Sequence, residues 1–130
     1  FKSVNDTHGH DVGDTVLAGF ARTISRLFRG GDFVSRYGGE EFVALLPRTD
    51  CEEARMIAER VRSTLKERGI GAPEETGVIT VSIGVAEVAV PGSASEHNSA
   101  RAALQEAIKE ADYYLYKAKQ DGRNRVRGSC

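Results

Sequence analysis

Residues Phe33–Leu46, which read FVSRYGGEEFVALL, contain two apolar runs separated by a glycine pair. The runs Phe33–Tyr37 and Glu41–Leu46 are rich in the β-branched and aromatic residues typical of strands, and Pro47 ends the second run. Tight two-residue hairpin turns need positive φ, so Gly38-Gly39 predicts such a turn. The stretch therefore predicts an antiparallel hairpin with two carboxylates, Glu40 and Glu41, close to its tip.

Helical patterns lie on both sides of the hairpin. Apolar residues at helical spacing predict a helix over Asp14–Phe28, which Gly30-Gly31 ends. A second helix starts near Thr49, because Thr49 and Glu52 have capping-box spacing, and it stops at Gly69.

The C-terminal half predicts one strand, a loop and a long helix. Alternation over Val78–Val85 favours a strand, and Val90–Ser99 is typical of a surface loop. A third helix is expected over Ala100–Gln120, with Asp121-Gly122 ending it and Val126 starting a short last strand.

The predicted order of elements is helix, strand, strand, helix, strand, helix and a short strand. This order favours an α+β fold in which helices pack on a mainly antiparallel sheet. The first helix lacks the preceding strand that such a unit requires, so we expect the first strand to lie before Phe1. We accordingly expect residues 1–130 to form a single domain that is truncated at its N-terminus.

The amino-acid composition limits which classes of function the chain can have. The chain has 130 residues, 40% of them hydrophobic and 28% charged, which suits one globular domain. Its 18 Lys+Arg and 19 Asp+Glu give a net charge of −1, which argues against a nucleic acid partner attracted by the whole surface. No metal or redox spacing connects Cys51 with Cys130, and no signal peptide or membrane-spanning run is visible. We expect a reduced, cytoplasmic domain, whose parent protein can still be membrane-anchored.

Four clusters of polar residues are candidates for chemistry, and each has a plain structural alternative. Glu40 and Glu41 suit either an exposed acidic turn or a site for a hard cation such as Mg²⁺. Asp14 suits a helix N-cap, although Asn5 and Asp14 together can read the polar edge of guanine. The neighbouring His8, His10 and Asp11 are only a weak metal signal.

The other two clusters are basic or of mixed charge. Arg29 and Asp32 suit an ion pair across a tight turn. The basic residues at the end of the third helix suit either the helix C-terminus or bound phosphate; they are Lys117, Lys119, Arg123, Arg125 and Arg127.

Five blocks taken together resemble the GGDEF domain of diguanylate cyclases, in its GGEEF form. Their order and spacing match the family over nearly the whole chain. The blocks are Phe1–Asp6, Gly9-His10-x-x-Gly13-Asp14, Arg36–Phe42, Thr80–Ala86 and Ala111-Asp112-x-x-Leu115-Tyr116-x-Ala118-Lys119-x-x-Gly122-Arg123-Asn124-Arg125. The resemblance implies a ferredoxin-like core akin to nucleotidyl cyclases.

The resemblance also implies a reaction and its substrate site. Two GTP molecules, one on each subunit of a homodimer, would be joined into cyclic di-GMP with release of two pyrophosphates. Glu40 would bind Mg²⁺ or Mn²⁺, with Glu41 in support, while Lys2 would offset developing charge. The remaining substrate-binding residues would be the Phe1 backbone at the triphosphate, Asn5 and Asp14 at guanine, Gly38 and Gly39 beside the nucleotide, and Lys119 and Arg123 at the terminal phosphates.

A second site is implied by the same resemblance. Arg29 and Asp32, with five residues between Asp32 and Gly38, match an inhibitory site that grips cyclic di-GMP, and Arg60 is the candidate third residue. In the family, a strand with Asp-x-Asp precedes Phe1-Lys2 and supplies a metal ligand, and a sensory or receiver domain lies further upstream. The alternatives are a non-catalytic cyclic di-GMP sensor and a ferredoxin-like RNA binder. The intact acidic pair speaks against the sensor, and an aromatic content of 7% speaks against the RNA binder.

Overall fold

A computed structural model describes residues 10–68, 79–89 and 97–130 of the chain. The chain divides into two compact units, Phe1–Thr49 with Arg60–Thr80 and Asp50–Glu59 with Val81–Cys130. None of the helices that the structure describes is long and apolar enough to cross a membrane.

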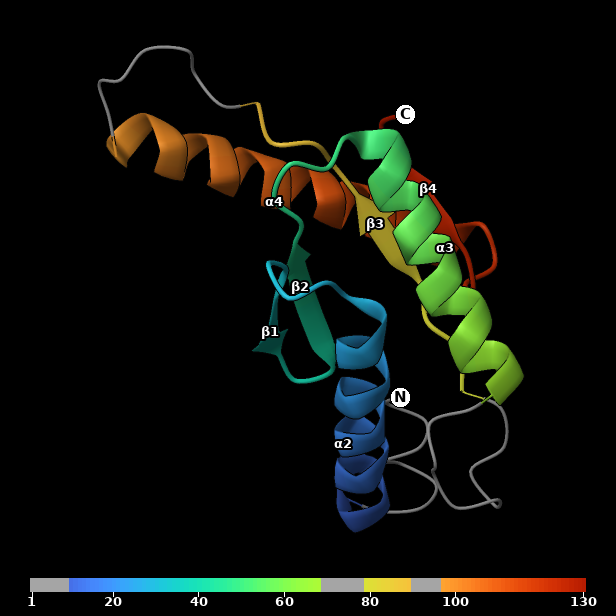
Figure 1. Ribbon diagram of the computed structural model, residues 1–130. Coiled ribbons are helices and arrows are strands. Elements are labelled where there is room, and N and C mark those ends of the chain that lie inside the picture. Colours follow the sequence, from blue (N-terminus) through green and yellow to red (C-terminus); the bar gives the residue numbers. More distant parts are fainter. Residues whose placement is uncertain (1–9, 69–78, 90–96) are drawn as a thin grey trace. The chain divides into compact units, whose positions relative to one another are not determined.

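The first unit is built on helix α2 and a β-hairpin (Figure 1). Helix α2 covers His10–Leu27 and buries Val16 and Ile24, which its apolar spacing predicts. Strands β1 (Phe33–Gly38) and β2 (Glu41–Leu45) pair antiparallel, with Phe33 opposite Leu45 and Arg36 opposite Phe42. The ring of Phe42 lies 4.8 Å from that of Phe20 on α2, which joins the hairpin to the helix.

Helix α3 (Cys51–Arg68) contributes its last part to the first unit and its first part to the second. It begins two residues later than predicted, and its cap is Asp50: the Asp50 carboxylate accepts a hydrogen bond from the Glu53 backbone N–H at 2.8 Å. The predicted capping box from Thr49 is wrong, because the Thr49 hydroxyl donates to the Pro47 carbonyl at 3.0 Å.

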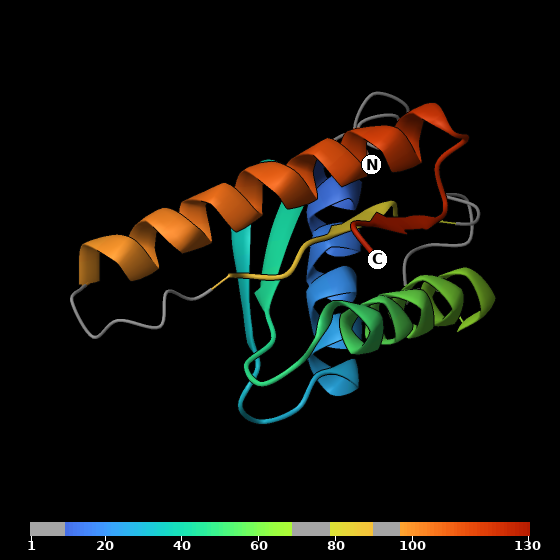
Figure 2. The same ribbon diagram turned by 90° about the horizontal axis from the view of Figure 1, so that it is seen from above.

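The second unit packs helix α4 (His97–Gln120) on a parallel pair of strands, β3 (Ile83–Val85) and β4 (Val126–Gly128). Figure 2 shows β3 and β4 side by side along α4. The packing is close, since a Cβ on Gly84 would lie 2.0 Å from the Ala111 carbonyl oxygen of α4. A small core of Cys51, Ala58, Val85 and Val126 holds the unit together.

Several predicted boundaries are corrected here. Helix α4 starts at His97, so the predicted loop Val90–Ser99 is wrong for its last three residues, while 90–96 lie outside the described residues. The predicted strand Val78–Val85 pairs only over Ile83–Val85, because its partner β4 offers three residues. The short strand predicted at Val126 is confirmed.

The expectation that the two cysteines are reduced is wrong. Cys51, at the start of α3, forms a disulfide with Cys130, and their Cα atoms lie 6.1 Å apart. Strand β4 brings the C-terminus back to α3, where the Cys130 carbonyl also accepts a hydrogen bond from Arg55. The bond therefore joins the start of α3 covalently to the C-terminus, two segments of the second unit.

Candidate functional site

The turn of the hairpin is offset by one residue from its prediction. Gly38 pairs with Glu41, so the turn residues are Gly39 and Glu40, and Tyr37 forms a bulge in β1. Neither Gly38 nor Gly39 has positive φ, so the predicted primed turn is wrong. Instead the Arg36 guanidinium closes the turn: its Nε donates to the Gly39 carbonyl at 3.0 Å, and Nη2 donates to the same oxygen.

The two glycines lie in open space. A Cβ built on Gly38 or Gly39 would meet no heavy atom within 4 Å. Neither positive φ nor packing within the described chain therefore requires glycine at these two positions. Since Glu40 and Glu41 are exposed beside them, the tip of the hairpin is a carboxylate-bearing edge with room for another molecule.

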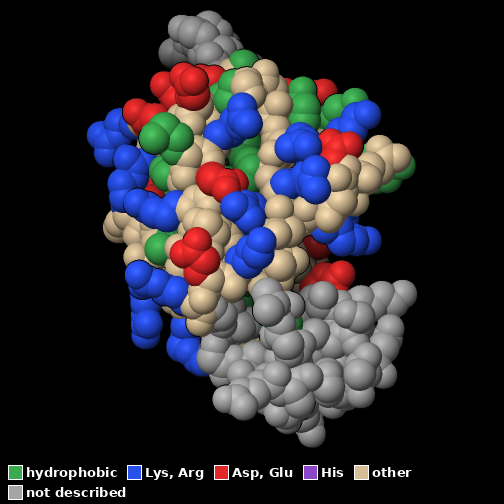
Figure 3. Space-filling model, turned by 90° about the vertical axis from the view of Figure 1, so that its right-hand side faces the viewer, with side chains coloured by type: hydrophobic (Ala, Val, Ile, Leu, Met, Phe, Trp, Pro, Cys, Tyr) green, Lys and Arg blue, Asp and Glu red, His purple; other side chains and the backbone are tan. Residues whose placement is uncertain are grey.

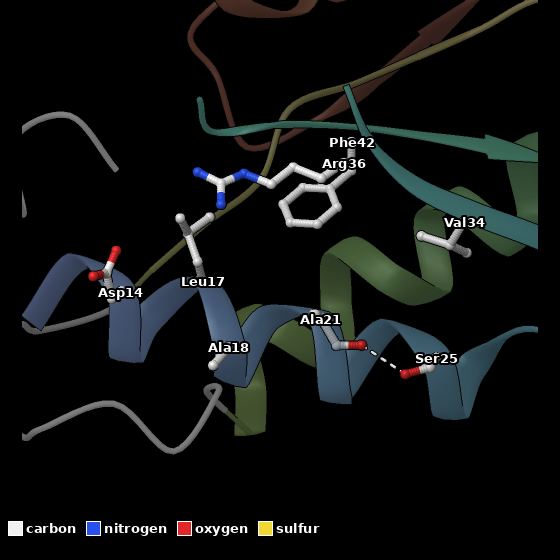
Figure 4. A pocket seen from close by; sticks show the side chains of 8 residues that line it. All are labelled: Asp14, Leu17, Ala18, Ala21, Ser25, Val34, Arg36 and Phe42. Carbon is white, nitrogen blue, oxygen red and sulfur yellow. Dashed lines mark hydrogen bonds between the residues drawn. The ribbon is translucent and has the colours of Figure 1, made fainter. Parts of the chain in front are cut away.

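A pocket of about 590 Å³ lies between α2 and the hairpin, a volume typical of small-molecule sites. Figure 4 shows Leu17 and Asp14 on α2 facing Phe42 and the guanidinium of Arg36, which reach over from the hairpin. Ala18, Ala21, Ser25 and Val34 complete the lining. An apolar floor with a carboxylate and a guanidinium at one end suits a flat heteroaromatic ring with a polar edge.

Asp14 belongs to this pocket through its position on α2. The helix begins at His10, so Asp14 lies inside it and the interpretation of Asp14 as an N-cap is wrong. The side chain is exposed and faces the pocket (Figure 4). Of the other residues predicted for the substrate, Phe1, Lys2 and Asn5 lie outside the described residues, as does His8, and only the backbone of His10 and Asp11 is described.

The residues predicted for a second site meet at the C-terminal end of α2. Arg29 Nε lies 3.5 Å from the Asp32 carboxylate, whose side chain is only 3% exposed, and the Arg29 backbone N–H donates to the same carboxylate at 2.8 Å. Arg60 Nη2 donates to the Leu27 carbonyl at 2.9 Å. The predicted ion pair is confirmed, and the end of α2 is contacted by Arg60 of α3, while Arg29 lies in the turn that follows α2.

The cations at the end of α4 divide by their contacts. Arg127 pairs with Asp121 at 2.9 Å, and this hydrogen bond is the largest cause that holds the pKa of the Asp121 carboxyl below its ordinary value; the charges of Arg125 and Lys117 act in the same direction, against desolvation. Lys117 lies 5.8 Å from the ring centre of Tyr113. Among the described residues, no hydrogen bond or ion pair occupies the side chains of Lys119 and Arg123.

The surface around α3 carries both signs of charge. On the face drawn in Figure 3, Lys and Arg side chains are spread among Asp and Glu side chains. This mixture agrees with the net charge of −1 and differs from the basic stripe typical of nucleic-acid-binding proteins.

Within the described residues, the hairpin supplies some of the ligands that a metal ion needs, but not a full set. Glu40 and Glu41 supply hard carboxylate oxygens, the donor type that Mg²⁺ and Mn²⁺ prefer. In residues 10–68, 79–89 and 97–130, no group of three His, Cys, Asp or Glu side chains is placed to hold a metal ion. The donor type therefore fits, while a further ligand has to come from outside the described residues, as the Asp-x-Asp expectation requires.

Of the eight residues that line the pocket, the sequence analysis named only Asp14 as a site residue; among the seven that it missed are Leu17, Arg36 and Phe42. Hairpin register is the signal that could have found the last two, since Arg36 and Phe42 are directly opposite and share the sheet face that meets α2. Leu17 lies one turn after Asp14 on the same helix face.

Comparison with known proteins shows which family the chain belongs to. The family model "Diguanylate cyclase, GGDEF domain" matches residues 1–125. Diguanylate cyclase DgcM of Escherichia coli is 45% identical over 127 residues, which is 97% of this chain and 28% of DgcM. Diguanylate cyclase A of Treponema denticola is 39% identical over 126 residues, covering 97% of this chain and 32% of the relative.

Solved structures give the same result. The coiled coil and GGDEF domain of DgcB from Caulobacter crescentus, in complex with c-di-GMP, matches with a TM-score of 0.81 and 34% identity over 98% of this chain and 63% of that one. The active GGEEF domain of a diguanylate cyclase from Vibrio cholerae matches with a TM-score of 0.81 and 32% identity over 99% of this chain and 76% of that one.

The fold is thus that of a small α+β domain whose hairpin tip carries a Gly-Gly-Glu-Glu sequence beside a pocket. The chain belongs to the GGDEF domain family of diguanylate cyclases. It spans 28% of the length of DgcM and 32% of the length of diguanylate cyclase A.

Proposed function

We propose that the protein containing this domain is a diguanylate cyclase, which condenses two GTP molecules into cyclic di-GMP and releases two pyrophosphates. One observation supports this proposal above the others: the pocket of Asp14 and Leu17 shares Arg36 with the turn that presents Glu40. A pocket with room for a base and a carboxylate edge lie in one unit, and a nucleotide needs both in order to be held at its base and at its phosphates.

The proposed roles of Asp14, Leu17, Phe42 and the two glycines rest on this arrangement, and those of Lys119 and Arg123 rest on the resemblance to the family. Asp14 accepts hydrogen bonds from the N–H donors on the guanine edge, while Leu17 and Phe42 cover the ring. Gly38 and Gly39 leave room for the sugar and phosphates beside the turn. Lys119 and Arg123 neutralise the terminal phosphates, which stabilises the charge of the departing pyrophosphate.

The metal and the second subunit complete the proposal. Glu40 would hold Mg²⁺ or Mn²⁺ with support from Glu41, and the ion would neutralise the triphosphate and orient it for attack. Each chain holds one GTP, so two chains must face each other as a homodimer for each 3′-hydroxyl to attack the α-phosphate on its partner. Phe1, Lys2 and Asn5 remain predicted contacts of the triphosphate, the developing charge and guanine. The cytoplasmic location of this domain also remains a proposal.

The decisive experiment uses the full-length protein with GTP and Mg²⁺, and cyclic di-GMP is measured by chromatography and mass spectrometry. Glu40→Gln removes one charge with little change in shape, and we expect it to abolish product formation. Glu106→Gln, the same change at an exposed site on α4, is the matched control and should leave turnover unchanged. Retained activity of Glu40→Gln would show that the role of Glu40 is wrong.

The cluster at the end of α2 favours an added role, inhibition by product. Arg29 pairs with the buried Asp32 carboxylate and Arg60 bonds to the Leu27 carbonyl nearby in the chain, a set of charges that suits a ligand with both phosphates and guanine edges. DgcB of Caulobacter crescentus was solved in complex with c-di-GMP, which is consistent with a product site in this family.

Cyclic di-GMP binding by the full-length protein, measured by calorimetry, tests this role. Arg60→Met, which keeps the Arg29–Asp32 ion pair, should weaken binding and relieve inhibition while GTP turnover without product is retained. Binding of cyclic di-GMP without any GTP turnover would favour the non-catalytic sensor instead. Equal inhibition of the wild type and Arg60→Met would contradict the product site.

A further inference from the structure

The loop that follows α4 has an unusual backbone. Gly122 has φ of 123°, and the two residues after it, Arg123 and Asn124, also have positive φ, 63° and 47°. Residues with side chains rarely adopt this left-handed conformation, and two in succession need contacts that hold them there. The loop joins α4 to β4, and its backbone conformation sets the direction in which the Arg123 side chain leaves the chain.

The backbone on the α4 side holds the loop by a helix-ending motif. The Arg123 N–H donates to the Ala118 carbonyl at 2.9 Å, and the Gly122 N–H donates to the Lys119 carbonyl at 3.4 Å. These bonds end α4 with left-handed Gly122 just beyond it, as in a Schellman motif. They hold the backbone N–H groups of Gly122 and Arg123, but the Arg123 carbonyl needs a different partner.

The Arg125 side chain supplies that second contact. Its Nε donates to the Arg123 carbonyl at 2.9 Å, while its own backbone carbonyl accepts a hydrogen bond from the Ile83 N–H at 3.0 Å. The backbone of Arg125 is therefore held by the first residue of β3, and its side chain folds back to the Arg123 carbonyl. The peptide that follows Arg123 is held between the end of α4 and this anchored guanidinium.

Gly122 makes room for the guanidinium. A Cβ on Gly122 would lie 2.6 Å from Arg125 Nη2 and 3.3 Å from Arg125 Cζ. The Nη2 end of the guanidinium thus lies against the glycine, and a side chain at this position would have to displace it. The neighbouring Arg127 plays a different part, since it pairs with Asp121 instead.

We propose that Arg125 is a positioning residue that fixes the backbone of Arg123 so that the exposed Arg123 guanidinium faces the terminal phosphates of a nucleoside triphosphate. The inference rests on the proposed function, which assigns Lys119 and Arg123 to those phosphates. It adds a residue that acts through Arg123 without touching the nucleotide. Fixing the backbone before binding reduces the entropy lost when the guanidinium engages the phosphates.

The experiment compares nucleotide binding and backbone conformation in the full-length protein. Calorimetry with GTP and with GMP, both with Mg²⁺, is carried out on the wild type, Arg125→Met, Arg123→Met and the double variant. Arg101→Met, at an exposed position on α4, is the control. Selective ¹⁵N labelling of arginine and asparagine reports the left-handed backbone through the HN–Hα couplings of Arg123 and Asn124.

We expect Arg125→Met to weaken GTP binding about tenfold and GMP binding less than twofold, and to change both couplings. The double variant should bind GTP no more weakly than Arg123→Met alone, because Arg125 acts only through Arg123. A purely structural role would instead weaken GTP and GMP equally, which would overturn the inference. Unchanged couplings in Arg125→Met would overturn it as well.

The design separates this inference from the proposed function. Weaker GTP binding in Arg123→Met together with unchanged binding in Arg125→Met refutes the positioning role alone. Unchanged GTP binding in Arg123→Met refutes the assignment of Arg123 to phosphate, and with it the ligand that this inference names. In that case the couplings still decide whether Arg125 holds the loop.

Discussion

Replacing Gly39 by alanine separates the stability of the hairpin from its function. A Cβ at Gly39 meets no heavy atom within 4 Å, and its φ is not left-handed, so alanine fits the backbone without strain. The Arg36 hydrogen bonds go to the Gly39 carbonyl, which alanine retains. We expect the free energy of unfolding to change by no more than about 0.5 kcal/mol, as at other surface sites without special features.

The activity of Gly39→Ala should nevertheless fall. If the open space beside Gly39 is the place of the GTP sugar and phosphates, the added methyl group displaces them from Glu40. A loss of at least about tenfold in kcat/KM for GTP corresponds to only about 1.4 kcal/mol of transition-state stabilisation, which one misplaced contact can remove.

The same substitution at Gly84 is the matched control for stability. There a Cβ would lie 2.0 Å from the Ala111 carbonyl oxygen and 2.4 Å from the Leu115 nitrogen, both in the backbone of α4. Neither atom can move without displacing the helix, so we expect Gly84→Ala to destabilise by about 3 kcal/mol, the upper part of the range for overpacking.

Urea unfolding followed by circular dichroism measures both stabilities, and cyclic di-GMP production by the full-length protein measures activity. Gly39→Ala with wild-type turnover would refute the reasoning, because the glycine would then serve neither ligand nor fold. Marked unfolding of Gly39→Ala would refute the inference that the space beside it is free.

Two further predictions concern the second unit. The Cys51–Cys130 disulfide joins residues 79 positions apart, so Cys130→Ser or a reductant should lower the free energy of unfolding by about 2–4 kcal/mol, and equal melting temperatures with and without reductant would contradict this. Because the pKa of Asp121 is lowered in the folded state, the stability from its pairing with Arg127 should be present above the ordinary pKa of 3.8 and be lost as the pH falls through the lower folded value. A carbon NMR titration of the Asp121 carboxyl should show a lower pKa in the wild type than in Arg127→Met, and identical titrations would contradict the cause.

Residue spacing predicted the elements well where periodic burial decides them. Val16 and Ile24 of α2 and Val61 and Leu65 of α3 are buried, as their helical spacing requires. The paired strands β1 and β2 follow equally from their composition. Helix ends were harder to predict, because Thr49 and Asp50 are both good caps, and the Thr49 hydroxyl is engaged by Pro47 and Arg29.

Contacts between distant residues left no local trace in the sequence. Nothing near Cys51 or Cys130 indicates their pairing, because it depends on β4 returning the C-terminus to the start of α3. The turn of the hairpin lies one residue beyond its predicted position for a local reason, because Arg36 and Gly39 are only three residues apart. The Arg36 guanidinium holds the Gly39 carbonyl, and this side-chain contact outweighs the general preference for a glycine pair at the two turn positions.

Some residues of the candidate site could be predicted from the sequence, and others are shown only by the structure. Four site residues could be predicted from the sequence, because their charges suit binding of a metal ion, guanine or phosphate. They are Glu40, Asp14, Lys119 and Arg123. Arg36 and Arg125 carry the same charge as many surface arginines, and only the structure shows each donating to a backbone carbonyl next to a predicted site residue. In both cases the guanidinium donates its hydrogen bonds to backbone carbonyls of the same chain, that of Gly39 next to Glu40 and that of Arg123. A change at either arginine should therefore alter how the neighbouring residue is presented to a nucleotide, and only secondarily the charge of the site.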